Sequence, residues 1–332
     1  MHNHDDLIGR ARGALLGVAI GDAMGAPVEG RSAAEIRALH GRVTSFVSDA
    51  AVGTDDTDFT LFNALLLADY GTSIAVAQVE AEWRDKLLAP GRAYRPGGFS
   101  DVVSTRNLVA GLHAPQSGAW GHQMWSDGVA MAISPAGIVA AGRPDLAARL
   151  AITLGCVSNG RDGLWAAQAV AAAVAVAMVG ESPQVMFEAA LVAVPADSWT
   201  GRSLRRAAAI CDRLSDDLDT ALQQLSDELV IPWWPWADLV TEAVPLAFGA
   251  FLAAKGEFHR AVPAGVSLGR DADTIGAIVG SLAGAYGGVD AIPPQWAQQA
   301  AVSPGTCIGV VAGTDIGAVA ERLVERALEA AA

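Results

Sequence analysis

The stretch GRARGALLGVAIGDAMG, residues 9–25, carries a glycine at every fourth position. A second stretch, DADTIGAIVGSLAGAYGG at residues 271–288, repeats this spacing from Gly276 to Gly288. Each glycine inside a helix costs about 1 kcal/mol relative to alanine, so both stripes give up helix stability. Close approach of two helix backbones is the usual compensation for this loss. We therefore infer two central helices that pack tightly enough to hold their ends in fixed positions.

A membrane interpretation of the first stripe is excluded because Arg10, Arg12 and Asp22 interrupt it, whereas helix pairs in a bilayer use this spacing within an apolar segment. The most apolar stretch of the chain, residues 164–179, is rich in alanine, short and interrupted by Gln168. A membrane span needs about 20 strongly apolar residues. This stretch predicts a buried core helix, and we expect no membrane association.

The composition predicts an all-α protein. The chain has 332 residues, of which 52% are hydrophobic and 17% charged, and this excludes a disordered chain. Apolar periodicity and turn residues indicate helix after helix with short connections, which is typical of one compact domain over residues 1–332. The predicted helices span residues 7–23, 55–70, 74–89, 101–112, 129–141, 145–155, 163–179, 184–193, 202–213, 217–228, 237–254, 257–265, 274–286 and 316–330.

Charge and cysteine content limit the partners and the compartment. The formal net charge is −14, with Lys86 and Lys255 as the only lysines, and no basic stripe suits a phosphate backbone. We expect no nucleic-acid partner. The N-terminus is polar and acidic, unlike a signal peptide. The three cysteines are odd in number and far apart, which favours a reducing cytoplasm over a disulfide framework.

Two acidic motifs lie at predicted helix N-termini. GTDDTD, residues 53–58, precedes an apolar run, and GRDADT, residues 269–274, precedes the second glycine stripe. One interpretation is that a threonine or aspartate of each motif caps its helix while the other acids are solvated. Capping needs one such residue per helix, however, and neighbouring carboxylates repel unless a cation or strong donors offset their charge. We therefore favour a metal site.

The ligand types select the metal. Both motifs offer carboxylate and hydroxyl oxygens and no histidine, which favours Mg²⁺ or Mn²⁺ over Zn²⁺. The carboxylates of Asp55, Asp56, Asp271 and Asp273 match the charge of two divalent cations. A two-metal centre can hold vicinal hydroxyls and lower the pKa of a bound water.

Other motifs carry less support. The segment that starts at Asp271 begins like an EF-hand loop, but its twelfth position is Leu282 rather than glutamate. GVSLG, residues 265–269, matches GxSxG, yet no histidine follows it. No phosphate-binding GxxxxGK[ST] or dinucleotide GxGxxG loop occurs. The loop PWWPW, residues 232–236, either packs as a lid or satellite core, which we favour, or forms an aromatic wall for a base or sugar ring.

Three blocks of sequence, in this order, resemble the ADP-ribosylglycohydrolases, the family that includes dinitrogen reductase-activating glycohydrolase and the crystallin J1 relatives. The blocks are GALLGVAIGDAMGAPVE at residues 13–29, TDDT at residues 54–57, and GRDADT at residues 269–274 with the glycine-rich stretch after it. The resemblance implies a compact, orthogonal all-α fold with a binuclear Mg²⁺ or Mn²⁺ centre at the bottom of a cleft. It also implies hydrolysis of the bond between the ribose anomeric carbon and an acceptor, often an ADP-ribosylated side chain.

The resemblance further implies roles for particular residues of this chain. The resemblance implies a catalytic role for Glu29 and Asp56, because either carboxylate would take a proton from the attacking water. The metal ligands that it implies are Thr54, Asp55, Asp56, Asp271, Asp273 and Thr274. The residues that we expect to contact the substrate are Asp22, Asp127, Gly128, Ser158, Asn159 and Trp234.

The chain departs from the family pattern at three places. Members commonly read Asn-Gly-x-x-Met-Arg where residues 127–132 read DGVAMA, so the arginine is absent. The Ser/Thr-His pair of the family is Ser158-Asn159 here, and Asp58 replaces the Gln or Glu that follows TDDT. These changes affect the part that would hold the distal phosphates and adenosine.

Three functions are therefore open. The first is a glycohydrolase for ADP-ribosylated protein or ADP-ribose conjugates, which we favour. The second keeps the chemistry and takes a smaller, uncharged, nucleoside-like N-riboside. The third is a non-catalytic, crystallin-like or ligand-binding relative, which the complete set of matched ligands disfavours because a structural role does not need paired acids.

Overall fold

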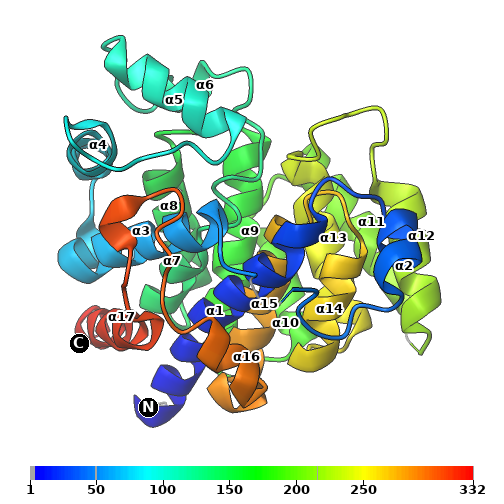
Figure 1. The fold of residues 1–332 in the computed structure, drawn as a ribbon. Coiled ribbons are helices and arrows are strands. Elements are labelled where there is room, and N and C mark those ends of the chain that lie inside the picture. Colours follow the sequence, from blue (N-terminus) through cyan, green and yellow to red (C-terminus); the bar gives the residue numbers. More distant parts are fainter. Residues whose placement is uncertain (1–3, 49–50, 215, 332) are drawn as a thin grey trace.

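The computed structural model describes residues 4–48, 51–214 and 216–331, and within them the regular structure is helical, with only isolated β-bridges (Figure 1). The predicted all-α fold is confirmed. The long helices are α1 (His4–Gly25), α2 (Ala33–His40), α3 (Asp55–Tyr70), α4 (Val76–Trp83), α5 (Phe99–Val109), α8 (Pro144–Gly155), α9 (Asp162–Ala177), α10 (Pro183–Val192), α11 (Trp199–Arg213), α12 (Leu218–Leu229), α13 (Val240–Ala253), α14 (Phe258–Ser267), α15 (Ala272–Gly287) and α17 (Ile316–Glu329). The short ones are α6 (Gln116–Ala119), α7 (Ser134–Val139) and α16 (Pro294–Gln299).

The two glycine stripes pack against each other in the middle of the molecule, where α1 and α15 lie side by side and antiparallel (Figure 1). A Cβ atom built on Gly17 would lie 2.0 Å from the carbonyl oxygen of Gly280, and one built on Gly21 would lie 2.0 Å from that of Gly276. No side chain fits between backbones at this distance. The inferred close packing of two central helices is therefore confirmed.

The remaining helices surround this pair and share one hydrophobic core. In α9, every residue from 169 to 177 is buried, which confirms the predicted core helix in this alanine-rich stretch.

Across the described parts of the chain, no helix combines the length and the apolar character that crossing a membrane requires. The predicted domain of residues 1–332 includes residues 1–3, 49–50, 215 and 332, which lie outside the described part.

Two predicted helices differ clearly from the structure, and α2, α6 and α16 were not predicted. The predicted helix 129–141 is reduced to α7, because residues 128–132 form turns and the preceding Asp127 N–H donates to the carbonyl oxygen of Asp238 at 3.2 Å. The prediction for 74–89 is divided into α4 and a π-helical turn, Arg84–Leu88. Helix α2 was not predicted, although Ser32 and Glu35 form a capping box at its start.

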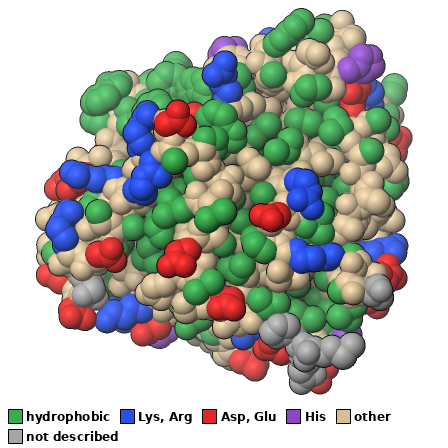
Figure 2. Space-filling model, turned by 180° about the vertical axis from the view of Figure 1, so that it is seen from behind, with side chains coloured by type: hydrophobic (Ala, Val, Ile, Leu, Met, Phe, Trp, Pro, Cys, Tyr) green, Lys and Arg blue, Asp and Glu red, His purple; other side chains and the backbone are tan. Residues whose placement is uncertain are grey.

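On the face of the molecule that Figure 2 shows, acidic, basic and apolar side chains are interspersed. The acidic surplus of the chain is therefore not gathered on this face. The three cysteines are free and buried, as expected for a chain without a disulfide framework.

Candidate metal centre

The antiparallel packing of α1 and α15 brings the end of the first glycine stripe to the start of the second acidic motif. Asp22 in the last turns of α1 is fully buried. Its carboxylate accepts hydrogen bonds from the backbone N–H groups of Thr54 (2.7 Å) and Thr57 (3.0 Å), and from the hydroxyl of Thr54 at 2.8 Å. Asp22 therefore holds the first turn of α3 against α1, which places both acidic motifs at one point.

The acids of the two motifs do not act as helix caps. Thr54 is the N-cap residue of α3, but its hydroxyl donates to Asp22 and accepts no bond from the helix. Asp271 is the N-cap residue of α15 and also makes no side-chain cap hydrogen bond. In the first turn of α15, the Thr274 N–H donates to Asp273 Oδ1 at 3.1 Å. The capping interpretation therefore leaves most of these acids unexplained.

Two groups of carboxylates converge at this point, and Asp273 belongs to both. One group is Asp22, Asp56 and Asp273, and the other is Glu29, Asp271 and Asp273; in each, one oxygen per residue lies within 4.8 Å of the others. Asp56 Oδ1 is buried without a hydrogen-bond partner. A buried carboxylate oxygen is normally paired with a hydrogen-bond donor or bound to a cation. An oxygen without a donor in this position is typical of a metal ligand, so these residues fit a divalent metal.

Electrostatics support the same conclusion. Burial raises the pKa of Asp56 well above its ordinary value, and the charges of Asp22 and Asp273 raise it further. Burial and the charge of a neighbouring carboxylate also raise the pKa values of Asp271 and Asp273 well above the ordinary value. Burial raises the pKa of Asp22 to about 7, although hydrogen bonds from Thr57 and Thr54 act in the opposite direction. Bound divalent cations would remove this repulsion, and oxygen ligands suit hard cations.

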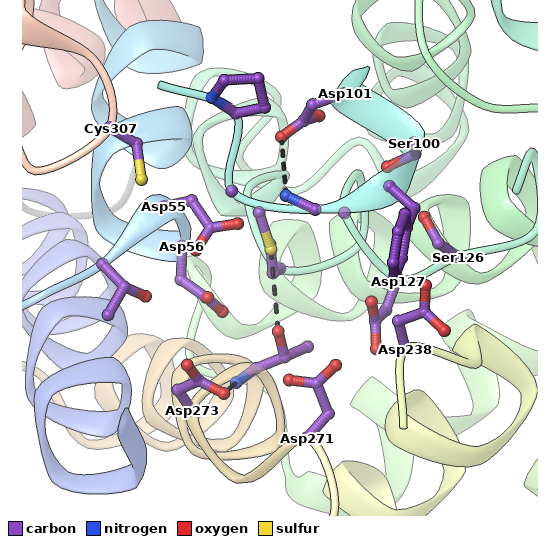
Figure 3. Close-up of a pocket in the computed structure, with 18 of the residues that line it drawn as sticks. Asp55, Asp56, Ser100, Asp101, Ser126, Asp127, Asp238, Asp271, Asp273 and Cys307 are labelled. Atoms are coloured by element: carbon purple, nitrogen blue, oxygen red, sulfur yellow. Dashed lines mark hydrogen bonds between the residues drawn. The ribbon is translucent and has the colours of Figure 1, made fainter. Parts of the chain in front are cut away.

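The acids open into a cleft of about 430 Å³. Figure 3 shows Asp55, Asp56, Asp271 and Asp273 directed into this space, with Asp127 on its other side. The predicted metal ligands Thr54, Asp55, Asp56, Asp271, Asp273 and Thr274 all line the cleft, together with Glu29 and with Asp127 and Gly128 of the predicted substrate-binding set.

A loop that precedes α5 covers part of the cleft. Gly97 of this loop lies so close to Asp55 that a Cβ atom there would meet the Asp55 carboxylate at 2.0 Å. The N–H of Gly98 donates to Asp101 Oδ2 at 3.4 Å (Figure 3). Burial, followed by the charge of Asp55, raises the pKa of Asp101 to about 7. The first turn of α5 therefore adds another acid to the cleft.

The opposite wall is also acidic. Asp127 Oδ2 is buried without a hydrogen-bond partner, and burial and the charge of Asp238 raise the Asp127 pKa well above its ordinary value. Among the described residues that line the cleft, Arg95 is the one that carries a basic side chain. The acids of the cleft therefore attract cations and hydrogen-bond donors.

Aromatic rings form one rim of the cleft. Phe99 and Trp236 both line it and are about half exposed, with ring centroids 5.8 Å apart. Trp234, which we expected to contact the substrate, lies behind Trp236 and donates its Nε1–H to Asp238 at 3.0 Å. Trp236 thus occupies the wall position that the sequence interpretation placed at Trp234, and the loop combines packing with a partial aromatic wall.

Four predicted substrate-binding residues do not line the cleft. Besides Trp234 and Asp22, these are Ser158 and Asn159, which are buried behind it. The Asn159 side-chain amide donates to the carbonyl oxygen of Ser126 at 3.0 Å and supports the segment that carries Asp127. Asp22 lies beneath the cleft in the carboxylate group instead of on its wall.

Several cleft residues were missed by the sequence interpretation. They are Arg95, Phe99, Asp101, Asp238, Thr306 and Cys307. None belongs to a motif, and neither spacing nor periodicity distinguishes them. Thr306 and Cys307 come from a loop near the C-terminus, and the Thr306 hydroxyl donates to the carbonyl oxygen of Gly53 at 3.0 Å.

Asp58, where the chain departs from the family pattern, has a structural role. Its side chain is buried and does not line the cleft. It accepts hydrogen bonds from the N–H groups of Cys307 (2.7 Å) and Ile308 (3.0 Å) and from the Ser303 hydroxyl at 3.0 Å. Asp58 therefore anchors the C-terminal loop that completes the cleft.

Asp58→Ala is expected to lower the free energy of unfolding by about 2–3 kcal/mol, because two buried N–H groups would lose a charged acceptor. Urea denaturation followed by circular dichroism measures this loss. Asp58→Asn keeps an acceptor oxygen and should lose less. Equal stability of Asp58→Ala and the parent would contradict the anchoring role.

Comparison with known proteins agrees with this geometry. The family model described as ADP-ribosylglycohydrolase matches residues 3–331. An "Uncharacterized protein" of Archaeoglobus fulgidus is 31% identical over 295 residues, which cover 86% of this chain and 89% of that protein. A solved structure titled "ADP-ribosylglycohydrolase-related protein complex" superposes with a TM-score of 0.67 at 24% identity, over 97% of this chain and 99% of that one, and shows the same fold. The chain belongs to the ADP-ribosylglycohydrolase family.

Proposed function

We propose that this protein is a divalent-metal-dependent ribosyl glycohydrolase that hydrolyses the anomeric bond of ADP-ribosylated protein or of ADP-ribose conjugates. The observation that carries the proposal is the pair of carboxylate groups that share Asp273 at the bottom of a cleft. Family membership supports the type of reaction. Thr54, Asp55, Asp56, Asp271, Asp273 and Thr274 would hold two Mg²⁺ or Mn²⁺ ions.

Bound there, the cations would neutralise the buried charge and act as Lewis acids on the ribose hydroxyls and on a water. The chain's own residues position the acids and stabilise the charge that develops on the substrate. Asp22 fixes α3 against α1, so that the acids of both motifs are held before substrate enters. The acidic walls would stabilise the positive charge that develops on the ribose in an oxocarbenium-like transition state.

Glu29 is the proposed proton acceptor. It is the solvent-exposed member of the two carboxylate groups, whereas Asp56, the other candidate, is 2% exposed. Partial burial and the nearby charge of Asp55 raise the pKa of Glu29 above its ordinary value. Glu29 is therefore a better base near neutral pH than an ordinary glutamate. Glu29→Gln should reduce kcat strongly and weaken Mn²⁺ binding much less than Asp56→Asn does, as titration calorimetry can measure.

A second candidate substrate class has its own support. The cleft is acidic, carries one basic side chain and has the half-exposed ring of Trp236 at its rim. A small N-riboside with a planar base fits these features without a site for distal phosphates.

The test is a substrate panel. The protein is incubated with Mn²⁺ and ADP-ribosyl-arginine, ADP-ribosyl-serine or one of several nucleosides, and free ribose or ADP-ribose is followed by chromatography. Release of ADP-ribose supports the proposed function, and turnover of nucleosides alone selects the second candidate. Tight Mn²⁺ binding without turnover of any substrate would reject both in favour of a non-catalytic relative.

A further inference from the structure

A second cavity, of about 850 Å³, lies between α2, α12 and α14. It shares no lining residue with the acidic cleft. Its volume is within the range of roughly 300–1,000 Å³ that is typical of small-molecule sites in proteins. The cavity is therefore large enough to take a ligand, and it is separate from the candidate metal centre.

The charge of this cavity is opposite to that of the cleft. Arg37 and Arg42 line it from the α2 side and Arg260 from α14, whereas Asp219 is the one acid among its described lining residues. The chain as a whole carries a net charge of −14, so this cavity differs in charge from the molecule around it. His259 lines the same wall as Arg260. The cavity therefore favours an anion.

Existing ion pairs leave these arginines available. Arg42 lies 3.0 Å from Asp219, but both side chains are about two-thirds exposed. Arg260 lies 3.4 Å from Glu257, which does not line the cavity. Arg37 makes no ion pair with any residue in the described part of the chain. Exposed pairs of this kind contribute little free energy, about 0–1 kcal/mol, so an anionic ligand can replace them.

The floor of the cavity is apolar and fixed. Ile36 and Trp296 line it and are almost fully buried. The Trp296 ring packs against Phe46 and Phe258, with centroids 6.1 and 6.4 Å away, and its Nε1–H donates to the Ser45 hydroxyl at 3.2 Å. A ligand that fills this space has an apolar or aromatic part as well as an anionic group.

The walls are held in place without a ligand. The capping box of Ser32 and Glu35 begins α2. The segment before α2 is tied to the segment after α14 by two backbone hydrogen bonds, from Arg270 N–H to Arg31 O (2.6 Å) and from Gly30 N–H to Arg270 O (2.8 Å). Because α2 and α14 are connected in this way, the cavity is preformed, and binding would not have to order it.

We propose that this cavity is a binding site for a small phosphate ester with an aromatic or apolar group. The phosphate lies between the arginines of α2 and α14, where charge-assisted hydrogen bonds hold it, and the ring lies over the apolar floor. The site does not depend on the proposed glycohydrolase activity, because its residues are not those of the cleft.

The test uses 1-naphthyl phosphate as the probe and isothermal titration calorimetry as the readout. The full-length protein is kept in EDTA, so that the probe cannot bind through cations in the cleft. We expect binding to the parent, and at least about tenfold weaker binding to the Arg37→Gln/Arg260→Gln double variant, because two charged donors are lost. 1-Naphthol, which lacks the charge, should bind much more weakly than the ester.

A charge-matched control is Arg106→Gln/Arg149→Gln, which removes two exposed arginines elsewhere on the molecule. It should bind the probe as the parent does, and so should Asp56→Asn, which changes only the cleft. Circular dichroism checks that each variant is folded. The proposal is overturned if the parent does not bind the probe, if Arg37→Gln/Arg260→Gln binds it unchanged, or if the control or Asp56→Asn loses binding equally.

Discussion

Asp56→Asn is expected to abolish the stabilisation of this protein by Mn²⁺ and to raise the thermal stability of the metal-free chain. Asp56 is buried, one of its oxygens has no partner, and its neighbours are carboxylates. In the absence of metal, removal of its charge relieves repulsion. With metal, the same change removes a ligand, so affinity and turnover should each fall by more than about 100-fold.

Differential scanning fluorimetry in EDTA and in excess Mn²⁺ measures both effects. A ligand at 100 times its Kd stabilises the folded state by about 2.7 kcal/mol, which is a readily measured shift in Tm. Asp273→Asn should behave in the same way, since Asp273 belongs to both carboxylate groups. Asp55→Ala and Asp273→Ala are also expected to abolish turnover with the fold retained.

Asp197→Asn is a matched control, because it makes the same charge change at an exposed position. It should leave the Mn²⁺ response unchanged. If Mn²⁺ raised the Tm of Asp56→Asn as much as that of the parent, the ligand assignment would be wrong.

Gly17→Ala is expected to destabilise the fold by about 3 kcal/mol or more, which is near or beyond the upper end of ordinary overpacking costs. The added methyl group would lie 2.0 Å from the carbonyl oxygen of Gly280. The obstacle is backbone on a helix that carries its own closely packed glycine, so neither helix can move aside without separating the pair. Because this pair also brings Asp22 to Asp273, Mn²⁺ affinity should fall with stability.

Gly9→Ala provides the contrast within the same stripe. A Cβ atom on Gly9 meets nothing within 4 Å. The substitution should therefore stabilise the protein by up to about 1 kcal/mol through helix propensity alone. Urea denaturation of both variants separates the two cases. Similar midpoints for Gly17→Ala and Gly9→Ala would show that the glycine contact is not what holds the helices together.

Helix α2 and helix α7 illustrate how far the sequence can be interpreted. The start of α2 has a local signal, since Ser32 and Glu35 form the capping box of a Ser-x-x-Glu pattern. No local signal indicates that the predicted helix 129–141 is shortened to α7. The turns before α7 are held by a hydrogen bond from the Asp127 N–H to the carbonyl oxygen of Asp238, which lies far away in sequence. Local signals predict helices, and distant contacts decide where some of them end.

The sequence alone determined the all-α fold, the pairing of the two glycine stripes and the prediction that both acidic motifs meet, because periodicity and spacing are properties of consecutive residues. Only the tertiary structure placed Asp101, Asp238 and Cys307 on the cleft and moved Ser158 and Asn159 behind it. It also gathered the arginines of α2 and α14 around a second cavity. These positions depend on how separate segments pack against a common core, and no short stretch of sequence contains that information.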